Sequence, residues 1–427
     1  IYMLIALGVC VLGILLISVL PFLINDSEFA QKQINIYYLF FLADNIASYF
    51  FVYKTTFLNA NQKNYVITLI RTCVQFFGIL FKCIALLFTK NFILYLLLTV
   101  LVTIANNICS SFYVTKKYSY LDKKIKANVD REDKTILIRN IKGLFLHKIG
   151  AFVVFGTDNI IISAFINLKT VGIYSNYSMI LSQLNTLASQ IFNAIIPGMG
   201  NYIATSCDEK RIYSMYRNIL FVDFLIYGFF TSVLACIFQP FIVWWIGLDG
   251  LLSKTVVYLL LLDFYLKGMR NAVQVMKNAG GIFYEDRFSP LIESATNLVV
   301  SVIMVKKCGI AGVFIGTIVS GLIAPFWITP FFLYRNVLKI PFKCYFKDMA
   351  YYFVILLIAV LGGEFIGRFI LNNNIILDTA VHFAIICIFD VILFFLFFHN
   401  KEEYKYLLEK CRRVLFKLKK GEKKNVV

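Results

Sequence analysis

Long apolar segments alternate with short polar ones along the whole chain. Each apolar run of about 20 residues is long enough to cross a hydrocarbon core of roughly 30 Å as a helix. The twelve runs cover about residues 1–24, 36–58, 64–89, 91–114, 145–166, 171–197, 218–246, 255–277, 287–305, 310–334, 349–371 and 378–398. They lack the apolar–polar alternation of barrel strands. The pattern predicts an all-α polytopic membrane protein with about 12 transmembrane helices.

Composition supports a membrane protein, because 60% of the residues are hydrophobic and only 15% are charged. Soluble domains contain about 45–50% apolar and about 25% charged residues. A net charge of +18 would suggest nucleic acid as the partner of a soluble protein, but here 30 of the 42 Lys and Arg residues lie on alternate connections. The positive-inside rule assigns those connections to the cytoplasm. We therefore expect a multi-pass protein of the plasma or inner membrane with a cytoplasmic C-terminus and no nucleic-acid partner.

Two basic segments lie outside the apolar runs, one between the fourth and fifth runs and one at the C-terminus. The longest internal connection, 115–144, separates four upstream spans from eight downstream ones and is the predicted boundary between two helical lobes. The tail 399–427 repeats apolar residues at helical spacing among lysines and arginines. It is predicted to form a basic amphipathic helix on the anionic inner leaflet.

One predicted span carries a stripe of charges. Asp263, Lys267 and Arg270 follow at i, i+4 and i+7, and Gln274 and Lys277 continue the same face. Charges in lipid are costly, so the stripe is expected to line a wet cavity. The alternative is an internal Asp263–Lys267 salt bridge that serves only its own helix.

A second cationic face is predicted in the span 64–89. Arg71, Gln75 and Lys82 lie on one side of that helix. Arg71 is expected to face a cavity. Lys82 is expected to do so or to reach the outer membrane surface with its long side chain.

Several spans contain acids. Asp158 lies about 13 residues into its span between Thr157 and Asn159, a setting that could hold a proton or a sodium ion or could fix helix packing. Glu364 and Arg368 are predicted to support each other at i, i+4. Solvent is expected around Asp223 and Glu293, and Pro197 and Gly198 are expected to end a helix. Asp44 and Asp390 are further single acids, and Asp390 has no evident partner.

Sequence motifs of catalysis are missing. The chain has no GxxxxGK followed by Ser or Thr, no GxSxG, no HExxH and no dinucleotide-binding glycine pattern. The cysteines form no CxxC or Cys/His cluster, so no metal site, cofactor or catalytic residue is expected. We expect the protein not to be an enzyme.

Two stretches carry a family resemblance. The first reads L-F-L-H-K-I-G at 144–150, G-T-D-N-I-I-I-S-A-F at 156–165 and V-G-I-Y-S-N-Y at 171–177, and the second is Leu42–Tyr65. They resemble polysaccharide biosynthesis membrane proteins, the Wzx-type oligosaccharide flippases of the multidrug/oligosaccharidyl-lipid/polysaccharide (MOP) superfamily. Such proteins have two six-helix lobes around a central cavity, often followed by two extra helices.

The resemblance implies a domain layout. It assigns 1–114 to an N-terminal lobe that holds four of its six spans, so the chain would lack the first two helices of the fold. It assigns 145–334 to the C-terminal lobe and 349–398 to the additional pair.

The resemblance also implies a cargo. An oligosaccharide on polyprenyl pyrophosphate would move from the cytoplasmic to the outer leaflet for O-antigen, capsule or exopolysaccharide assembly, with a polysaccharide polymerase and chain-length proteins as partners. Arg71, Lys82, Lys267 and Arg270 would neutralise the pyrophosphate, and Asp158 and Asp263 would couple transport to a proton or sodium gradient. Three alternatives stay open: a cation-coupled drug antiporter of the same superfamily, a membrane glycosyltransferase or polymerase, and a non-transporting scaffold.

Overall fold

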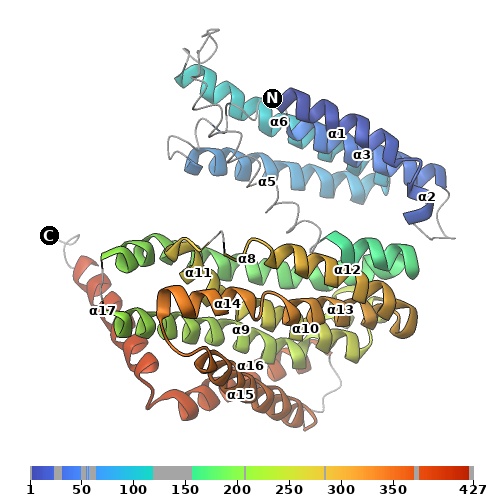
Figure 1. Cartoon of the computed structure of the whole chain (residues 1–427). Coiled ribbons are helices and arrows are strands. Elements are labelled where there is room, and N and C mark those ends of the chain that lie inside the picture. The colour runs from blue at the N-terminus through green and yellow to red at the C-terminus, as the bar shows by residue number, and fades with distance from the viewer. Residues whose placement is uncertain are drawn as a thin grey trace. The chain divides into compact units, whose positions relative to one another are not determined.

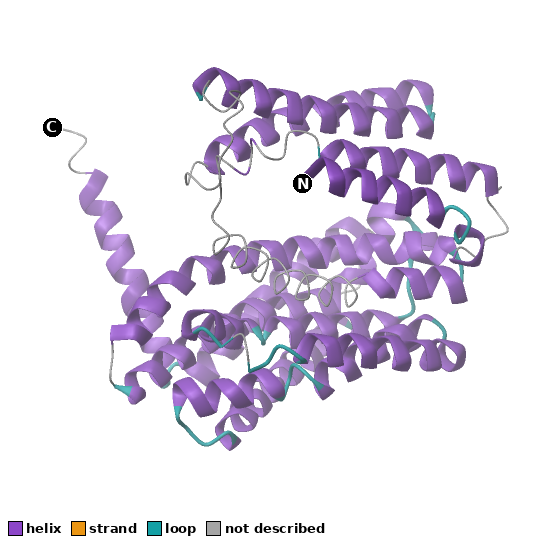
Figure 2. Cartoon of the chain, turned by 45° about the horizontal axis from the view of Figure 1, so that its top comes forward, coloured by secondary structure: helices purple, strands orange, loops and turns teal. Residues whose placement is uncertain are grey.

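Every described segment of regular structure is helical (Figure 2). The computed structural model describes residues 2–23, 31–49, 54, 56, 64–118, 156–205, 208–282, 285–369 and 375–422. Contacts divide the chain into two units, unit 1 at Ile1–Arg139 and unit 2 at Asn140–Val427. This boundary falls inside the predicted connection 115–144, whose residues from 119 onward lie outside the described residues.

Unit 1 is a small group of apolar helices. Its helices are α1 (Tyr2–Leu16), α2 (Leu20–Leu23), α3 (Gln31–Ser48), α5 (Asn64–Thr89) and α6 (Phe92–Lys117). The helix α6 packs against both α3 and α5. It begins directly after Asn91, whose side chain accepts hydrogen bonds from the backbone N–H groups of Ile93 and Leu94 and so caps the helix.

Unit 2 is built around one long helix, α9. Its elements are a helical segment at 156–165, α8 (Leu168–Thr205), α9 (Glu209–Ile246), α10 (Lys254–Gly268), α11 (Asn271–Gly280), α12 (Ser289–Cys308), α13 (Ile310–Ile323), α14 (Ile328–Leu333), α15 (Lys343–Gly367), α16 (Ile375–Phe398) and α17 (Glu402–Glu422). The helix α9 contacts α10, α11, α15, α16 and α17 (Figure 1). Large side chains on it, among them Tyr216, Phe224, Tyr227 and Phe238, are fully buried in the core.

Three predicted helix limits are wrong. The helix α8 continues past Pro197 and Gly198 to Thr205. Membrane helices tolerate proline because neighbouring groups can satisfy the backbone that it frees. The predicted span 255–277 is divided between α10 and α11 at Met269 and Arg270. The predicted span 310–334 is interrupted between α13 and α14, and a π-helical turn follows at Tyr334–Leu338.

Helices suited to a bilayer occur in both units. Within the described residues, six helices are long and apolar enough to cross a membrane: Val66–Thr89, Phe92–Lys117, Glu209–Ile246, Ile310–Leu338, Lys343–Gly367 and Ile376–Phe398. Many of their large apolar side chains are exposed on the protein surface, for example Leu87 and Phe88. Such apolar surface is stable in contact with lipid, so the chain is a multi-pass, all-α membrane protein.

The predicted tail helix is present as α17 and lies against one end of unit 2 (Figure 1). Arg217 of α9 forms an ion pair with Glu403 at 2.7 Å, and the Glu403 side chain is almost fully covered. The hydroxyl of Tyr406 lies 3.8 Å from the sulfur of Met215. These contacts hold the start of α17 on α9, while its position on the inner leaflet stays a prediction.

Candidate functional site

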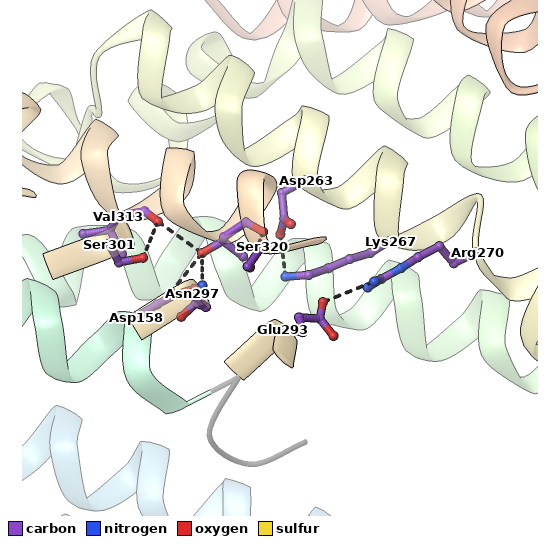
Figure 3. A network of polar contacts seen from close by, with 10 residues as sticks. Asp158, Asp263, Lys267, Arg270, Glu293, Asn297, Ser301, Val313 and Ser320 are labelled. Carbon is purple, nitrogen blue, oxygen red and sulfur yellow. Dashed lines mark hydrogen bonds and ion pairs between the residues drawn. The ribbon is translucent and has the colours of Figure 1, made fainter. Parts of the chain in front are cut away.

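A buried polar cluster joins three helical segments of unit 2 (Figure 3). The hydroxyl of Thr317 on α13 donates to Oδ1 of Asp158 at 3.1 Å, and Nδ2 of Asn297 on α12 donates to that hydroxyl at 3.0 Å. Thr157 donates to Oδ1 of Asn297 at 3.0 Å and completes the link between 156–165 and α12. Asp158, Asn297 and Thr317 are all buried. A buried polar group without a partner would cost about 1–3 kcal/mol, so these contacts specify how the three segments pack.

Small residues on α13 allow the cluster to form. A Cβ atom at Gly316 would lie 2.6 Å from the backbone nitrogen of Ser301, and one at Gly312 would lie 2.6 Å from that of Val305. Glycines at i and i+4 let two membrane helices approach closely. The approach brings Ser301 to the carbonyl of Val313, to which it donates at 3.1 Å. It also places Thr317, one residue beyond Gly316, within reach of Asn297.

The cluster is rich in oxygen atoms. Besides the carboxylate of Asp158 it contains the hydroxyls of Thr317 and Ser301, the amide oxygen of Asn297 and the carbonyl of Val313. Oxygen atoms of this kind bind hard cations, and a carboxyl group can take up a proton. Within the described ranges, no group of three or more His, Cys, Asp or Glu side chains could hold a metal ion. With one acid, the cluster suits a single positive charge.

Two ion pairs lie beside the cluster, and we call them the ion-pair row (Figure 3). Nζ of Lys267 lies 2.7 Å from Oδ2 of Asp263, one turn earlier on α10. A guanidinium nitrogen of Arg270 lies 3.2 Å from Oε1 of Glu293 on α12. The side chains of Arg270 and Glu293 are only 18% and 13% exposed, so this pair is largely removed from solvent. The row therefore offers two cations that already have acid partners.

A narrow pocket connects the row to the cluster. Asp263, Lys267, Arg270 and Thr317 all line it, and its volume is about 10 Å³. That is room for about one water molecule. A larger headgroup would need the ion pairs to open.

Arg270 also borders a much larger apolar pocket. This pocket has a volume of about 410 Å³ and runs between α10, α13 and α15. Its other lining residues are apolar or aromatic, among them Leu262, Phe326, Phe346 and Phe353. A cation therefore lies where a polar pocket and an apolar pocket meet.

The other two predicted cations belong to unit 1. Arg71 is exposed on α5, and the ammonium group of Lys82 lies 5.3 Å from the centre of the Tyr95 ring. Such a position over an aromatic face stabilises a cation. The structure thus brings Asp158, Asp263, Lys267 and Arg270 together, whereas a cavity shared with Arg71 and Lys82 stays a prediction.

Two acids that were expected in solvent are instead engaged in unit 2. Glu293 pairs with Arg270, and Asp223 is fully buried on α9, where it accepts a hydrogen bond at 3.1 Å from the backbone N–H of Ala272. Ala272 lies in the first turn of α11, where unsatisfied N–H groups attract a carboxylate. Asp390 accepts a hydrogen bond from Ser232 at 3.1 Å. In the sequence, the position of Glu293 within an apolar run is the signal that could have indicated a buried ion pair.

Comparison with known proteins gives a consistent result for the fold. The family model of polysaccharide biosynthesis proteins matches residues 1–203. A solved structure of the lipid II flippase MurJ in an inward closed conformation is similar, with a TM-score of 0.62 and 16% sequence identity over 93% of this chain and 82% of that chain. A MATE transporter from Vibrio cholerae, VcmN, is similar with a TM-score of 0.50 and 15% identity over 80% of this chain and 78% of that chain. Among proteins with curated descriptions, none matches the sequence.

Proposed function

We propose that the protein is a lipid-linked oligosaccharide flippase, because residues 1–203 match the family model of polysaccharide biosynthesis proteins and the chain has a fold similar to those of a lipid II flippase and a MATE transporter. The cargo would be an oligosaccharide on polyprenyl pyrophosphate. It would move from the cytoplasmic to the outer leaflet of the cell membrane by alternating access. A polysaccharide polymerase and chain-length proteins are the proposed partners.

The position of Arg270 is the observation that carries this proposal. The cargo is an amphiphile with an anionic pyrophosphate at one end of a long apolar chain. Arg270 belongs to the ion-pair row and also lines the apolar pocket along α15, so one region of unit 2 offers both chemistries. Arginine binds phosphate oxygens with two parallel hydrogen bonds, which a partly dehydrated site strengthens.

The ion-pair row supplies a mechanism for exchange. A pyrophosphate that approaches Lys267 and Arg270 competes with the carboxylates of Asp263 and Glu293. Once displaced, each acid loses its partner in a setting where an unpaired charge is costly, and uptake of a proton or sodium ion would offset that cost. Cargo binding and ion binding would then depend on each other.

Asp158 is the second proposed coupling group. It has no basic partner among its hydrogen bonds, and it shares Thr317 with the narrow pocket that Lys267 and Arg270 line. A proton or sodium ion in the oxygen-rich cluster would alter the contact between 156–165 and α13. Because Thr317 on α13 donates directly to Asp158, a change of charge there could bias the two states of an alternating-access cycle.

The decisive experiment separates Arg270 as a ligand from Arg270 as a structural partner. The full chain is reconstituted in proteoliposomes that contain a fluorescent oligosaccharide on polyprenyl pyrophosphate, and an impermeant quencher reports the transfer between leaflets. We expect Arg270→Gln to slow transfer at least tenfold and to lower stability, because it leaves Glu293 unpaired. Arg270→Gln combined with Glu293→Gln should restore stability while transfer stays slow.

The matched control is Lys307→Gln, which removes an exposed cation at the end of α12 and should leave transfer unchanged. Recovery of transfer in the Arg270/Glu293 double variant would contradict the proposal, because it would reduce Arg270 to an ion-pair partner of Glu293.

The neutral balance of the ion-pair row favours one competing function. Each cation of the row is paired with an acid, and Asp158 adds a buried carboxylate, so unit 2 could also serve a cationic drug exchanged for protons or sodium ions. Uptake assays in the same proteoliposomes distinguish the two functions. An antiporter would accumulate a lipophilic cation against an imposed ion gradient, and the flippase proposed here would not.

A further inference from the structure

A charged pocket lies at the end of unit 2 that is opposite to α17. It has a volume of about 560 Å³ and is bounded by the C-terminal part of α9, the start of α10, the end of α15 and the start of α16. Gln239 in its wall lies roughly 33 Å farther along α9 than Arg217, the residue that holds α17, at 1.5 Å of rise per residue. The pocket is therefore remote from the tail helix α17, and it shares no lining residue with the ion-pair row.

Four charged side chains line this pocket: Lys254 and Arg368, which are basic, and Glu364 and Asp378, which are acidic. Across the part of the chain that the structure describes, none of the four takes part in an ion pair. This corrects the expected Glu364–Arg368 pair. In addition, Oδ1 of Asp378 is buried without a hydrogen-bond partner. Opposite charges that share a pocket without pairing suit a ligand that carries both charges.

Exposed aromatic residues indicate the depth of the pocket in the membrane. Trp244 and Trp245 close α9 with 52% and 43% of their surface exposed, and Tyr258 lines the pocket itself with 37% exposed. Tryptophan and tyrosine gather at the level of lipid headgroups, where one end of the ring is apolar and the other is wet. The walls fit the same level, because apolar Val243, Leu251 and Val257 line the pocket together with its charged side chains.

We propose that this pocket binds the headgroup of a zwitterionic phospholipid with a primary ammonium, namely phosphoethanolamine. Lys254 and Arg368 would hold the phosphate, and Glu364 and Asp378 would accept hydrogen bonds from the ammonium. A phosphatidylglycerol headgroup would leave the two carboxylates without a cationic partner. A choline headgroup has no N–H group to donate to them.

The bound headgroup would connect two parts of unit 2. Lys254 belongs to α10, whereas Glu364 lies on α15, Arg368 directly follows α15, and Asp378 lies on α16. The lipid would thus bridge α10 and the last two membrane helices of unit 2. Under the predicted topology, the site takes its lipid from the outer leaflet. Binding of this lipid is independent of the identity of the transported cargo.

Native mass spectrometry of the full chain tests the proposal. The purified protein is incubated with equal amounts of phosphatidylethanolamine, phosphatidylglycerol and phosphatidylcholine that have identical acyl chains. We expect at least fivefold more bound phosphatidylethanolamine than either competitor. Glu364→Gln with Asp378→Asn should remove that preference, and Lys254→Gln with Arg368→Gln should lower retention of both phosphatidylethanolamine and phosphatidylglycerol at least threefold.

Two controls keep the result interpretable. Asp249→Asn with Lys307→Gln removes exposed charges outside the pocket and should leave the preference unchanged. Glu364→Asp with Asp378→Glu retains both carboxylates and should retain the preference, which separates lost binding from lost folding. Equal retention of the three lipids by the unaltered protein, an unchanged preference in the Gln/Asn variant, or displacement of phosphatidylethanolamine by a free oligosaccharide would each overturn the proposal.

Discussion

At the scale of single residues, Asp158 and Thr317 share one hydrogen bond, but substitutions of the two are expected to have different effects: one on transport and the other on stability. Asp158→Asn keeps the shape and an acceptor oxygen for Thr317 but removes the charge, so the protein should keep its thermal stability. Ion-dependent transport should be lost, because the buried site no longer carries a negative charge that can neutralise a proton or sodium ion. Transport in proteoliposomes with and without an imposed gradient measures the effect, and unchanged gradient dependence would leave Asp158 with a packing role only.

Thr317→Val removes the hydroxyl that joins Asp158 to Asn297 without changing the size of the side chain. Asn297 is fully buried, so its amide would lose a partner. Hydrogen bonds between membrane helices contribute about 1 kcal/mol or less, and the loss should appear as a modest fall in the melting temperature in detergent. A melting temperature equal to that of the unaltered protein would show that Asn297 finds another partner.

At the scale of elements, the contact between α12 and α13 positions the polar cluster. Gly316→Ala would place a methyl group 2.6 Å from the backbone nitrogen of Ser301, so the two helices would have to separate. We expect a lower melting temperature and weaker transport. Gly172→Ala on α8 is the matched control, because nothing lies within 4 Å of the added carbon. That control should be neutral or stabilising by about 0.5–1 kcal/mol, since alanine favours a helix. Equal behaviour of the two variants would show that α12 and α13 adapt to the added methyl group.

The interruption between α10 and α11 is a second property of elements. In one continuous helix, Asp263, Lys267, Arg270 and Lys277 would form a single stripe. The turn at Met269 and Arg270 divides them, so Lys267 pairs within α10, Arg270 reaches Glu293 on α12, and Lys277 reaches Asp286 at 2.6 Å. Gly268 permits this turn to pack closely, because a side chain there would clash with the ring of Tyr227.

At the scale of the whole molecule, the charge bias predicts orientation. Cys308 is exposed at the end of α12 on a connection assigned to the outside. In a chain whose other nine cysteines are replaced with alanine, an impermeant maleimide should label Cys308 in intact cells. Lys343→Cys, at the start of α15 on a predicted cytoplasmic connection, should be labelled only after the membrane is opened. The reverse pattern would invert the predicted topology and place the charged pocket in the inner leaflet.

The sequence by itself determined the class of this protein, because the thickness of the hydrocarbon core sets the length of each apolar run independently of its neighbours. It also identified Asp158, Asp263, Lys267 and Arg270 as candidate site residues, since a charge within an apolar run is costly in lipid and therefore rare. Only the tertiary structure decided their partners. Arg270 and Glu293 are 23 positions apart, and Asp158 and Thr317 are 159 apart. Helical spacing specifies the face on which a side chain lies, but not the helix that covers that face. The interruptions at Met269 and after Ile323 were equally hidden, because close packing of neighbouring helices, and not local apolar periodicity, accommodates them.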